Sequence, residues 1–110
     1  MTDEERAPTP YEGDELKSWR DNSLTGRKWF EENGISFLRH YTGSLACVPS
    51  RPTLFTGQYP DLHGVTQTDG LGKSYSDTRM RWLRKGEVPT LGHWFRAAGY
   101  DTHYDGKWHI

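Results

Sequence analysis

Hydrophobic positions are sparse along this chain of 110 residues, and they gather in short stretches. Residues 90–98 give the best helical pattern, because their apolar residues fall on one face and Gly99 follows as a stop. Residues 23–33 carry a partial apolar stripe and predict a second helix. Residues 49–56 predict a third, which begins with a proline in its first turn and ends at Gly57.

Two further stretches predict strands. Residues 35–42 alternate weakly and contain β-branched and aromatic residues, and residues 100–104 follow a predicted helix and its glycine stop. A helix, a stop and a strand in series form half of an α/β unit. Residues 1–22 are expected to be mostly loop, because two prolines exclude a helix around them, and residues 58–88 are also expected to be mostly loop.

Composition places the chain among the parts of a larger fold. Hydrophobic residues make up only 33%, so a closed core is hard to build, yet 14% aromatic residues argue against simple disorder. The chain also stops at Ile110 without a closing element. We therefore expect an α/β piece of an enzyme whose central strands lie elsewhere.

Charge and cysteine content exclude several classes of function. The net charge of -1 gives no electrostatic footprint for nucleic acid or for an anionic membrane. No apolar run approaches the roughly 20 residues that span a bilayer, and a single cysteine excludes an internal disulfide. The first residues contain no signal peptide, so we expect a cytoplasmic protein if this N-terminus is native, and a periplasmic or secreted one if a signal peptide was lost.

A first candidate site lies at residues 47–57, which read Cys-Val-Pro-Ser-Arg-Pro-Thr-Leu-Phe-Thr-Gly. Cys47 comes just before a predicted helix, where backbone N–H groups and the helix dipole stabilise an anion. Arg51 follows one helical turn later and adds a positive charge. Taken alone, Cys47 is more commonly a small buried hydrophobic residue.

A second candidate site lies at residues 99–109, which read Gly-Tyr-Asp-Thr-His-Tyr-Asp-Gly-Lys-Trp-His. Lys107 and His109 alternate, so an extended backbone projects them on the same side. Gly106 lets the backbone approach a ligand closely. The alternative is an ordinary aromatic strand with an exposed lysine and a solvated histidine.

Together these stretches resemble the two signatures of the sulfatase family, within the alkaline-phosphatase-like superfamily. The first signature, C-x-P-S-R-x-x-L-x-T-G, matches at Cys47, Pro49, Ser50, Arg51, Leu54, Thr56 and Gly57. The second, G-Y-x-T-x-x-x-G-K-W-H, matches at Gly99, Tyr100, Thr102, Gly106, Lys107, Trp108 and His109. The resemblance implies part of an α/β/α sandwich with a mainly parallel sheet. Residues 1–110 would then be an incomplete N-terminal catalytic domain.

The resemblance also implies a reaction, the hydrolysis of a small-molecule or glycan sulfate ester. Cys47 would be oxidised to formylglycine by a formylglycine-generating enzyme, and one hydroxyl group of the hydrated aldehyde would attack the sulfur atom. The second hydroxyl group would then expel sulfate. By the same analogy Arg51 holds the hydrated aldehyde, Lys107 contacts the sulfate oxygens and His109 hydrogen-bonds the diol.

A divalent metal belongs to the same implied site. Asp3 and Glu4 fall where the family places a metal-binding acidic pair, and the modified Cys47 would be a third ligand. Ca²⁺ is expected, with Mg²⁺ or Mn²⁺ as alternatives, and Ca²⁺ takes about 6–8 oxygen ligands, more than these residues supply. Glu4 departs from the family's usual second aspartate, and both residues could instead be solvated terminal charges.

Other functions remain open at the level of the sequence. The same signatures fit a formylglycine-dependent phosphonate monoester or phosphodiester hydrolase, or an inactive remnant. A thiol enzyme would require a reactive thiolate at Cys47. His63 is expected to anchor a loop rather than to react. A run of basic residues is expected to be a solvated loop. It comprises Arg79, Arg81, Arg84 and Lys85.

Overall fold

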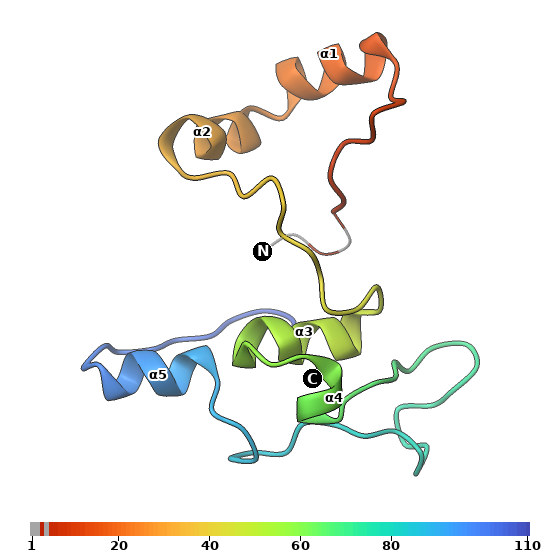
Figure 1. The fold of residues 1–110 in the computed structure, drawn as a ribbon, viewed down its shortest axis with the longest axis vertical. Coiled ribbons are helices and arrows are strands. Elements are labelled where there is room, and N and C mark those ends of the chain that lie inside the picture. The colour runs from red at the N-terminus through yellow and green to blue at the C-terminus, as the bar shows by residue number, and fades with distance from the viewer. Residues whose placement is uncertain (1–2, 4) are drawn as a thin grey trace. The chain divides into compact units, whose positions relative to one another are not determined.

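The structure, a computed structural model, describes residue 3 and residues 5–110. It divides into two compact units, Met1–His40 and Tyr41–Ile110, and each is described by itself. The first unit contains α1 (Asp14–Ser23) and α2 (Thr25–Asn33) (Figure 1). The second contains α3 (Cys47–Thr56), α4 (Pro60–His63) and α5 (Leu91–Ala97).

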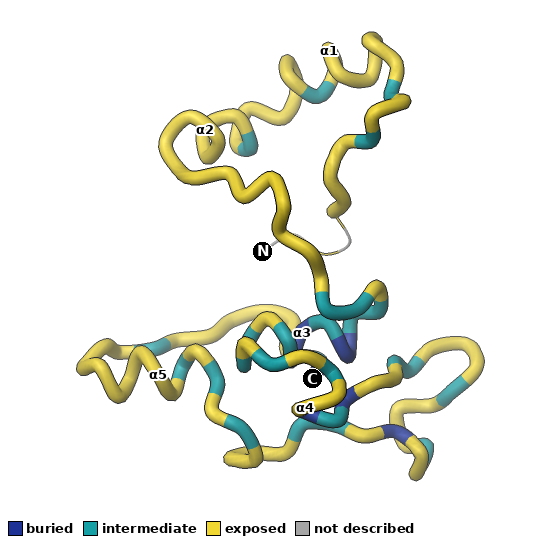
Figure 2. Tube along the Cα trace, viewed as in Figure 1, coloured by how far each residue is buried: buried dark blue, intermediate teal, exposed yellow. Residues whose placement is uncertain are grey.

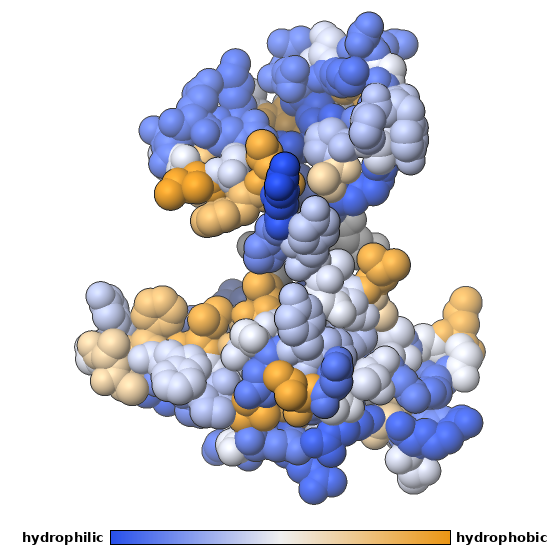
Figure 3. Space-filling view, in the orientation of Figure 1, coloured by the Kyte–Doolittle hydropathy of each residue, from blue (hydrophilic) through white to orange (hydrophobic). Residues whose placement is uncertain are grey.

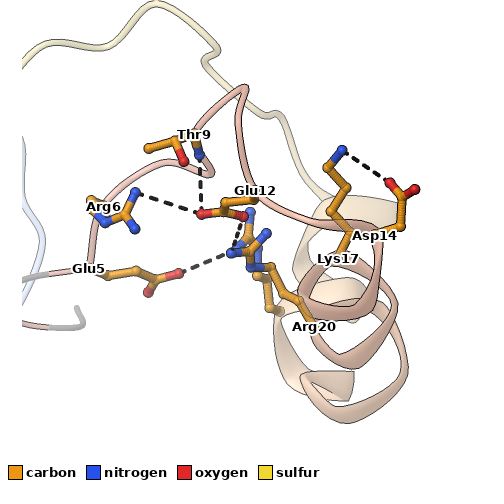
Figure 4. Close-up of polar contacts among 8 residues, drawn as sticks. Glu5, Arg6, Thr9, Glu12, Asp14, Lys17 and Arg20 are labelled. Carbon is orange, nitrogen blue, oxygen red and sulfur yellow. Dashed lines mark hydrogen bonds and ion pairs between the residues drawn. The ribbon is translucent and has the colours of Figure 1, made fainter.

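Ion pairs, rather than apolar packing, organise the first unit, because neither α1 nor α2 has a buried residue. Glu12 accepts a hydrogen bond from Arg20 at 2.6 Å and one from the backbone N–H of Thr9 at 3.2 Å, and it lies 3.6 Å from Arg6 (Figure 4). The Arg20 hydrogen bond is the main reason why the pKa of Glu12 lies below its ordinary value.

Helix α1 departs from the expectation that residues 1–22 are mostly loop, whereas α2 confirms the helix predicted within residues 23–33. The prolines restrict only their own surroundings, and Asp14 begins a new helix beyond them. Acidic residues in the first turn and Arg20 in the last turn complement the helix dipole. The charged residues indicated this helix in the sequence, whereas the hydrophobic pattern did not.

The core of the second unit lies where α3 packs against α4 (Figure 2). Its buried hydrophobic residues are few: Val48, Val65, Met80 and Ile110. Two prolines of α3 and His63 of α4 are buried beside them. The unit therefore depends on polar contacts as well as on apolar burial.

Helix α3 confirms the helix predicted at residues 49–56 and begins two residues earlier, at Cys47. Ala46 is its N-cap residue, in an extended conformation. Gly57 ends it with a φ of 72°, and the Gly57 N–H donates to the Thr53 carbonyl at 2.9 Å. Only glycine adopts this left-handed conformation without a Cβ penalty, which explains the sharp stop.

Helix α5 confirms the helix predicted at residues 90–98. The Thr90 N–H donates to Nδ1 of His93 at 3.1 Å, so a histidine takes the place that glutamate or glutamine occupies in a common helix cap. Gly99 follows with a φ of 89° and ends the helical conformation as predicted.

Both predicted strands are wrong, since the described part of the chain contains no strand. Residues 35–42 and 100–104 have no ladder partner. The one β-bridge among the described residues joins Gly70 to Lys73 and is isolated. A strand needs a neighbour for its backbone hydrogen bonds. Phe37 and Leu38 are instead 74% and 93% exposed. The sheet of the expected α/β sandwich is therefore not confirmed.

Large apolar side chains remain on the surface of each unit (Figure 3). The most exposed aliphatic side chains are Ile35, Leu38, Leu45 and Leu71. Within the described residues, none of the helices combines the length and the apolar character that a membrane crossing requires.

Candidate active site

Cys47 occupies the first position of α3 and is partly buried. Its Sγ atom lies 3.6 Å from Oγ1 of Thr68. The first backbone N–H groups of a helix have no partner within the helix, and the helix dipole adds positive potential there. The position therefore suits a side chain that carries or develops negative charge.

Arg51 joins α3 to the second sequence motif. Its side chain is buried, and Nε donates to the carbonyl of Trp108 at 2.8 Å. Nη2 donates to the hydroxyl of Tyr104 at 3.2 Å and to the carbonyl of Lys107. The guanidinium lies 5.9 Å from the centre of the Phe55 ring. One side chain thus brings together two motifs that are distant in the sequence.

Aromatic packing reinforces this junction. The rings of Phe55 and Trp108 stack with their centres 4.9 Å apart, and Tyr104 meets both rings edge to face, at 5.5 and 5.0 Å. Pairs of this kind add stabilisation beyond the area that they bury. The segment that carries Lys107 and His109 is therefore held against α3 by hydrogen bonds to Arg51 and by ring contacts with Phe55.

His109 pairs with a carboxylate. Its Nε2 atom lies 2.8 Å from Oδ1 of Asp69. Its ring centre lies 5.7 Å from that of Trp82. Its backbone φ of 49° falls in the left-handed region, which is uncommon outside glycine. Lys107 is exposed, and its carbonyl accepts the hydrogen bond from Arg51.

Thr68 and Asp69 are residues that the sequence analysis missed. They are adjacent in the chain, and Thr68 contacts Cys47 while Asp69 contacts His109. The structure therefore brings Cys47 and His109 to one two-residue segment. The only signal in the sequence was a polar pair before Gly70, inside a stretch that was expected to be loop.

The predicted metal ligands fall in different parts of the chain. Asp3 belongs to the first unit and Cys47 to the second, and Glu4 lies outside the described residues. The described residues include no group of three or more histidine, cysteine, aspartate or glutamate side chains that could hold a metal. By themselves they do not fit a complete metal centre.

His63 anchors a loop, as predicted. It is buried, its Nε2 lies 3.1 Å from Oγ1 of Thr53, and its Nδ1 accepts the N–H of Val65 at 3.1 Å. Burial lowers the pKa of His63 below its ordinary value, and the nearby charge of Arg81 lowers it further. Both ring nitrogens are used for structure.

Two arginines of the basic run pair with neighbouring carboxylates, which supports its interpretation as a solvated loop. Arg79 forms two hydrogen bonds with the carboxylate of Asp77, at 2.9 and 2.6 Å, and Arg81 pairs with Glu87. The Arg79 hydrogen bonds hold the pKa of Asp77 well below its usual range.

An apolar hollow of about 580 Å³ lies between α5 and the segment that follows it. Its lining includes Phe55, Phe95, Tyr100 and Trp108. The aromatic junction around Arg51 therefore forms one of its walls.

Comparisons with known proteins agree with the two motifs. The chain is 36% identical over 101 residues to an uncharacterized sulfatase, YidJ, of Escherichia coli (strain K12), covering 91% of this chain and 16% of that protein. It is 34% identical over 77 residues to an arylsulfatase of Hemicentrotus pulcherrimus, covering 70% and 13%. It is 33% identical over 78 residues to the N-acetylglucosamine-6-sulfatase of Homo sapiens, covering 70% and 14%.

The chain thus spans about a sixth or less of the length of these relatives. No solved structure gives a significant match. The family model described as Sulfatase matches residues 11–110, which include Cys47, Arg51, Lys107 and His109. This match and the identities show that the chain belongs to the sulfatase family.

Proposed function

We propose that this chain carries the nucleophile of a sulfuric ester hydrolase, with formylglycine at position 47 as the attacking group. The observation that carries the proposal is the meeting of the two motifs. Arg51 binds the carbonyls of Lys107 and Trp108, and the Thr68–Asp69 segment contacts both Cys47 and His109. A nucleophile, a cation and a proton-carrying ring thereby belong to one unit.

After hydration of the aldehyde, the proposed reaction takes place in two steps. Hydration of the aldehyde at position 47 gives two hydroxyl groups on one carbon. One of them loses its proton and forms a bond to sulfur, while the ester S–O bond breaks and the alcohol leaves with a proton. The other hydroxyl group then loses its proton, the aldehyde re-forms and sulfate leaves. Cys47 at the start of α3 suits the charge that develops in both steps.

Three further side chains stabilise charge or carry a proton in this reaction. The charge of Arg51, one helical turn from Cys47, offsets the negative charge of the hydrated residue while its donors hold the second motif. Lys107 binds the sulfate oxygens as a point charge. His109 holds or moves a proton at the hydrated residue, the common role of imidazole near neutral pH.

Sulfatases generally use a metal ion. We propose a divalent cation, Ca²⁺ first, with Asp3, Glu4 and the modified Cys47 among its ligands. The described residues do not assemble that centre by themselves.

The substrate class follows the names of the relatives. They include arylsulfatases and N-acetylglucosamine-6-sulfatases, which support a small-molecule or glycan sulfate ester as the substrate of this protein as well. The modification of Cys47 requires a formylglycine-generating enzyme as a partner.

Mass spectrometry tests the nucleophile. The full chain is expressed with a formylglycine-generating enzyme, and the tryptic peptide 40–73 is analysed, since the Arg51–Pro52 bond resists trypsin. We expect an aldehyde at position 47, absent from Cys47→Ala. An unmodified thiol beside a converted control peptide would refute the proposal. Labelling of that thiol by iodoacetamide at neutral pH would favour a thiol enzyme instead.

A further inference from the structure

The contact between Asp69 and His109 defines the state of the histidine ring. Oδ1 of Asp69 lies 2.8 Å from Nε2 of His109, and the two side chains are 28% and 25% exposed. An ionised carboxylate can only accept hydrogen bonds, so Nε2 must carry the proton that it donates. The carboxylate therefore selects one tautomer of His109 and one orientation of its ring.

The other ring nitrogen is left over. Nδ1 of His109 is buried, and among the described residues it has no hydrogen-bond partner. Buried polar atoms are paired in the great majority of cases, and an exception calls for an explanation. A ligand hydroxyl group that donates a hydrogen bond to this nitrogen would supply the missing partner.

The backbone holds the ring in place on both sides of His109. The preceding carbonyl, that of Trp108, accepts the Nε hydrogen bond of Arg51, and the following residue, Ile110, is buried. His109 itself has a φ of 49°. A side-chain-bearing residue keeps that conformation only where its surroundings enforce it, and such residues cluster at functional sites.

Asp69 is also held, and its position is linked to the nucleophile. It precedes a tight turn in which Gly70 and Lys73 exchange backbone hydrogen bonds of 2.9 and 3.2 Å. The Thr68 hydroxyl donates to the Asp69 carbonyl at 3.2 Å and lies 3.6 Å from Sγ of Cys47. A shift of this turn would therefore move both the group that contacts Cys47 and the group that contacts His109.

We infer that Asp69 is a positioning residue, which holds the imidazole of His109 by a protonated Nε2 and leaves Nδ1 to accept a hydrogen bond from a hydroxyl group of the substrate or of the hydrated residue 47. The identity of that hydroxyl group rests on the proposed function. The ring state does not, so the experiment below measures the ring directly.

The test is NMR spectroscopy of the side-chain nitrogens in the ¹⁵N-labelled full chain, at about pH 8, where imidazole is neutral. His109→Gln assigns the His109 signals. His63 is an internal reference for folding, because Val65 donates to its Nδ1 and so fixes its tautomer. Asp69→Ala and Asp69→Asn are compared with Asp105→Asn, which removes the same charge from an exposed position in the second motif.

We expect a protonated Nε2 on His109, with a downfield proton signal protected from exchange with water. Asp69→Ala should abolish that signal, Asp69→Asn should shift it upfield because an amide oxygen is the weaker acceptor, and Asp105→Asn should leave it unchanged. An unchanged signal in Asp69→Ala would overturn the inference. Loss of the His63 signals as well, in both Asp69 variants, would also overturn it, since Asp69 would then support the whole unit. Absence of formylglycine would refute only the proposed function.

Discussion

Single polar side chains hold the second unit where its apolar core is small. Arg51 is the clearest case, because it is 5% exposed and its donors reach the carbonyls of Lys107 and Trp108. A guanidinium presents several donors in a fixed plane, and the single ammonium group of lysine cannot reproduce that arrangement. Hydrogen bonds from a charged group are also stronger than those between neutral partners.

Replacing Arg51 by lysine should therefore destabilise the second unit by about 2 kcal/mol, since carbonyls lose donors in a buried place. Amide hydrogen exchange of α3 in the full chain measures the effect. Arg27→Lys is the matched control, because Arg27 lies in the first unit, where its ion pair with Glu31 is partly exposed. Equal exchange rates in α3 of the two variants would show that Arg51 is not the link.

His63 gives the second unit a dependence on pH. Its pKa is lowered in the folded state, so above the ordinary imidazole pKa of about 6.5 the ring is neutral in both states and its contribution is complete. As the pH falls below that value, His63 binds a proton in the unfolded chain but stays neutral in the folded chain, so the free energy of unfolding decreases. The loss continues until the folded-state pKa is passed.

The free energy of unfolding of the second unit should thus fall between about pH 7 and pH 5, a window above the ordinary pKa values of the carboxylates. Urea denaturation at a series of pH values measures it. His103→Gln should keep this slope, because His103 is exposed, whereas His63→Gln should remove it. A wild-type stability that is flat over this window would contradict the assignment.

At the scale of helices and strands, the sequence pattern predicted the elements that depend on neighbouring residues. The helices at residues 90–98, 49–56 and 23–33 were found, since periodicity and glycine stops act within a few residues. The strands at 35–42 and 100–104 were not, because a strand depends on a partner that is distant in the sequence. The motifs singled out Cys47 and His109 as candidates, but they did not indicate the Thr68–Asp69 segment, because its contacts join residues distant in the sequence.

The stop of α3 can be tested at Gly57, whose φ is 72° and where an added Cβ would meet no other atom. Gly57→Ala should therefore cost about 1 kcal/mol from backbone conformation alone. Gly26→Ala, inside α2 and equally free of contacts, should stabilise its helix by about 0.5–1 kcal/mol. Hydrogen exchange in each helix reads both changes. The same sign for both variants would refute this account of Gly57.

At the scale of the whole molecule, membership of the sulfatase family implies the alkaline-phosphatase-like α/β fold. The described residues supply helices, the two motifs and a small core, but no sheet. Many large apolar side chains stay exposed, and no group of metal-binding side chains forms among the residues described. The two motifs are thus present among these residues without the surrounding sheet that the family's fold implies. Charge stabilisation in catalysis requires a preorganised setting of that kind.

The purified 110-residue chain, with formylglycine at position 47, should therefore not hydrolyse an aryl sulfate. A fluorogenic assay with and without added Ca²⁺ measures this, and the matched background is the His109→Gln chain. Hydrolysis above that background would show that the chain completes an active site by itself.

Helix α3 also bears on the order of events during biosynthesis. Pro52 lies inside it, and an interior proline costs about 3 kcal/mol of helix stability. The helix therefore depends on what Arg51 and His63 contact once the second unit has closed. Before that moment we expect the segment around Cys47 to lack this helix. The oxidation proposed for Cys47 would therefore take place on the unfolded segment, and folding of the second unit would end the time in which it can occur.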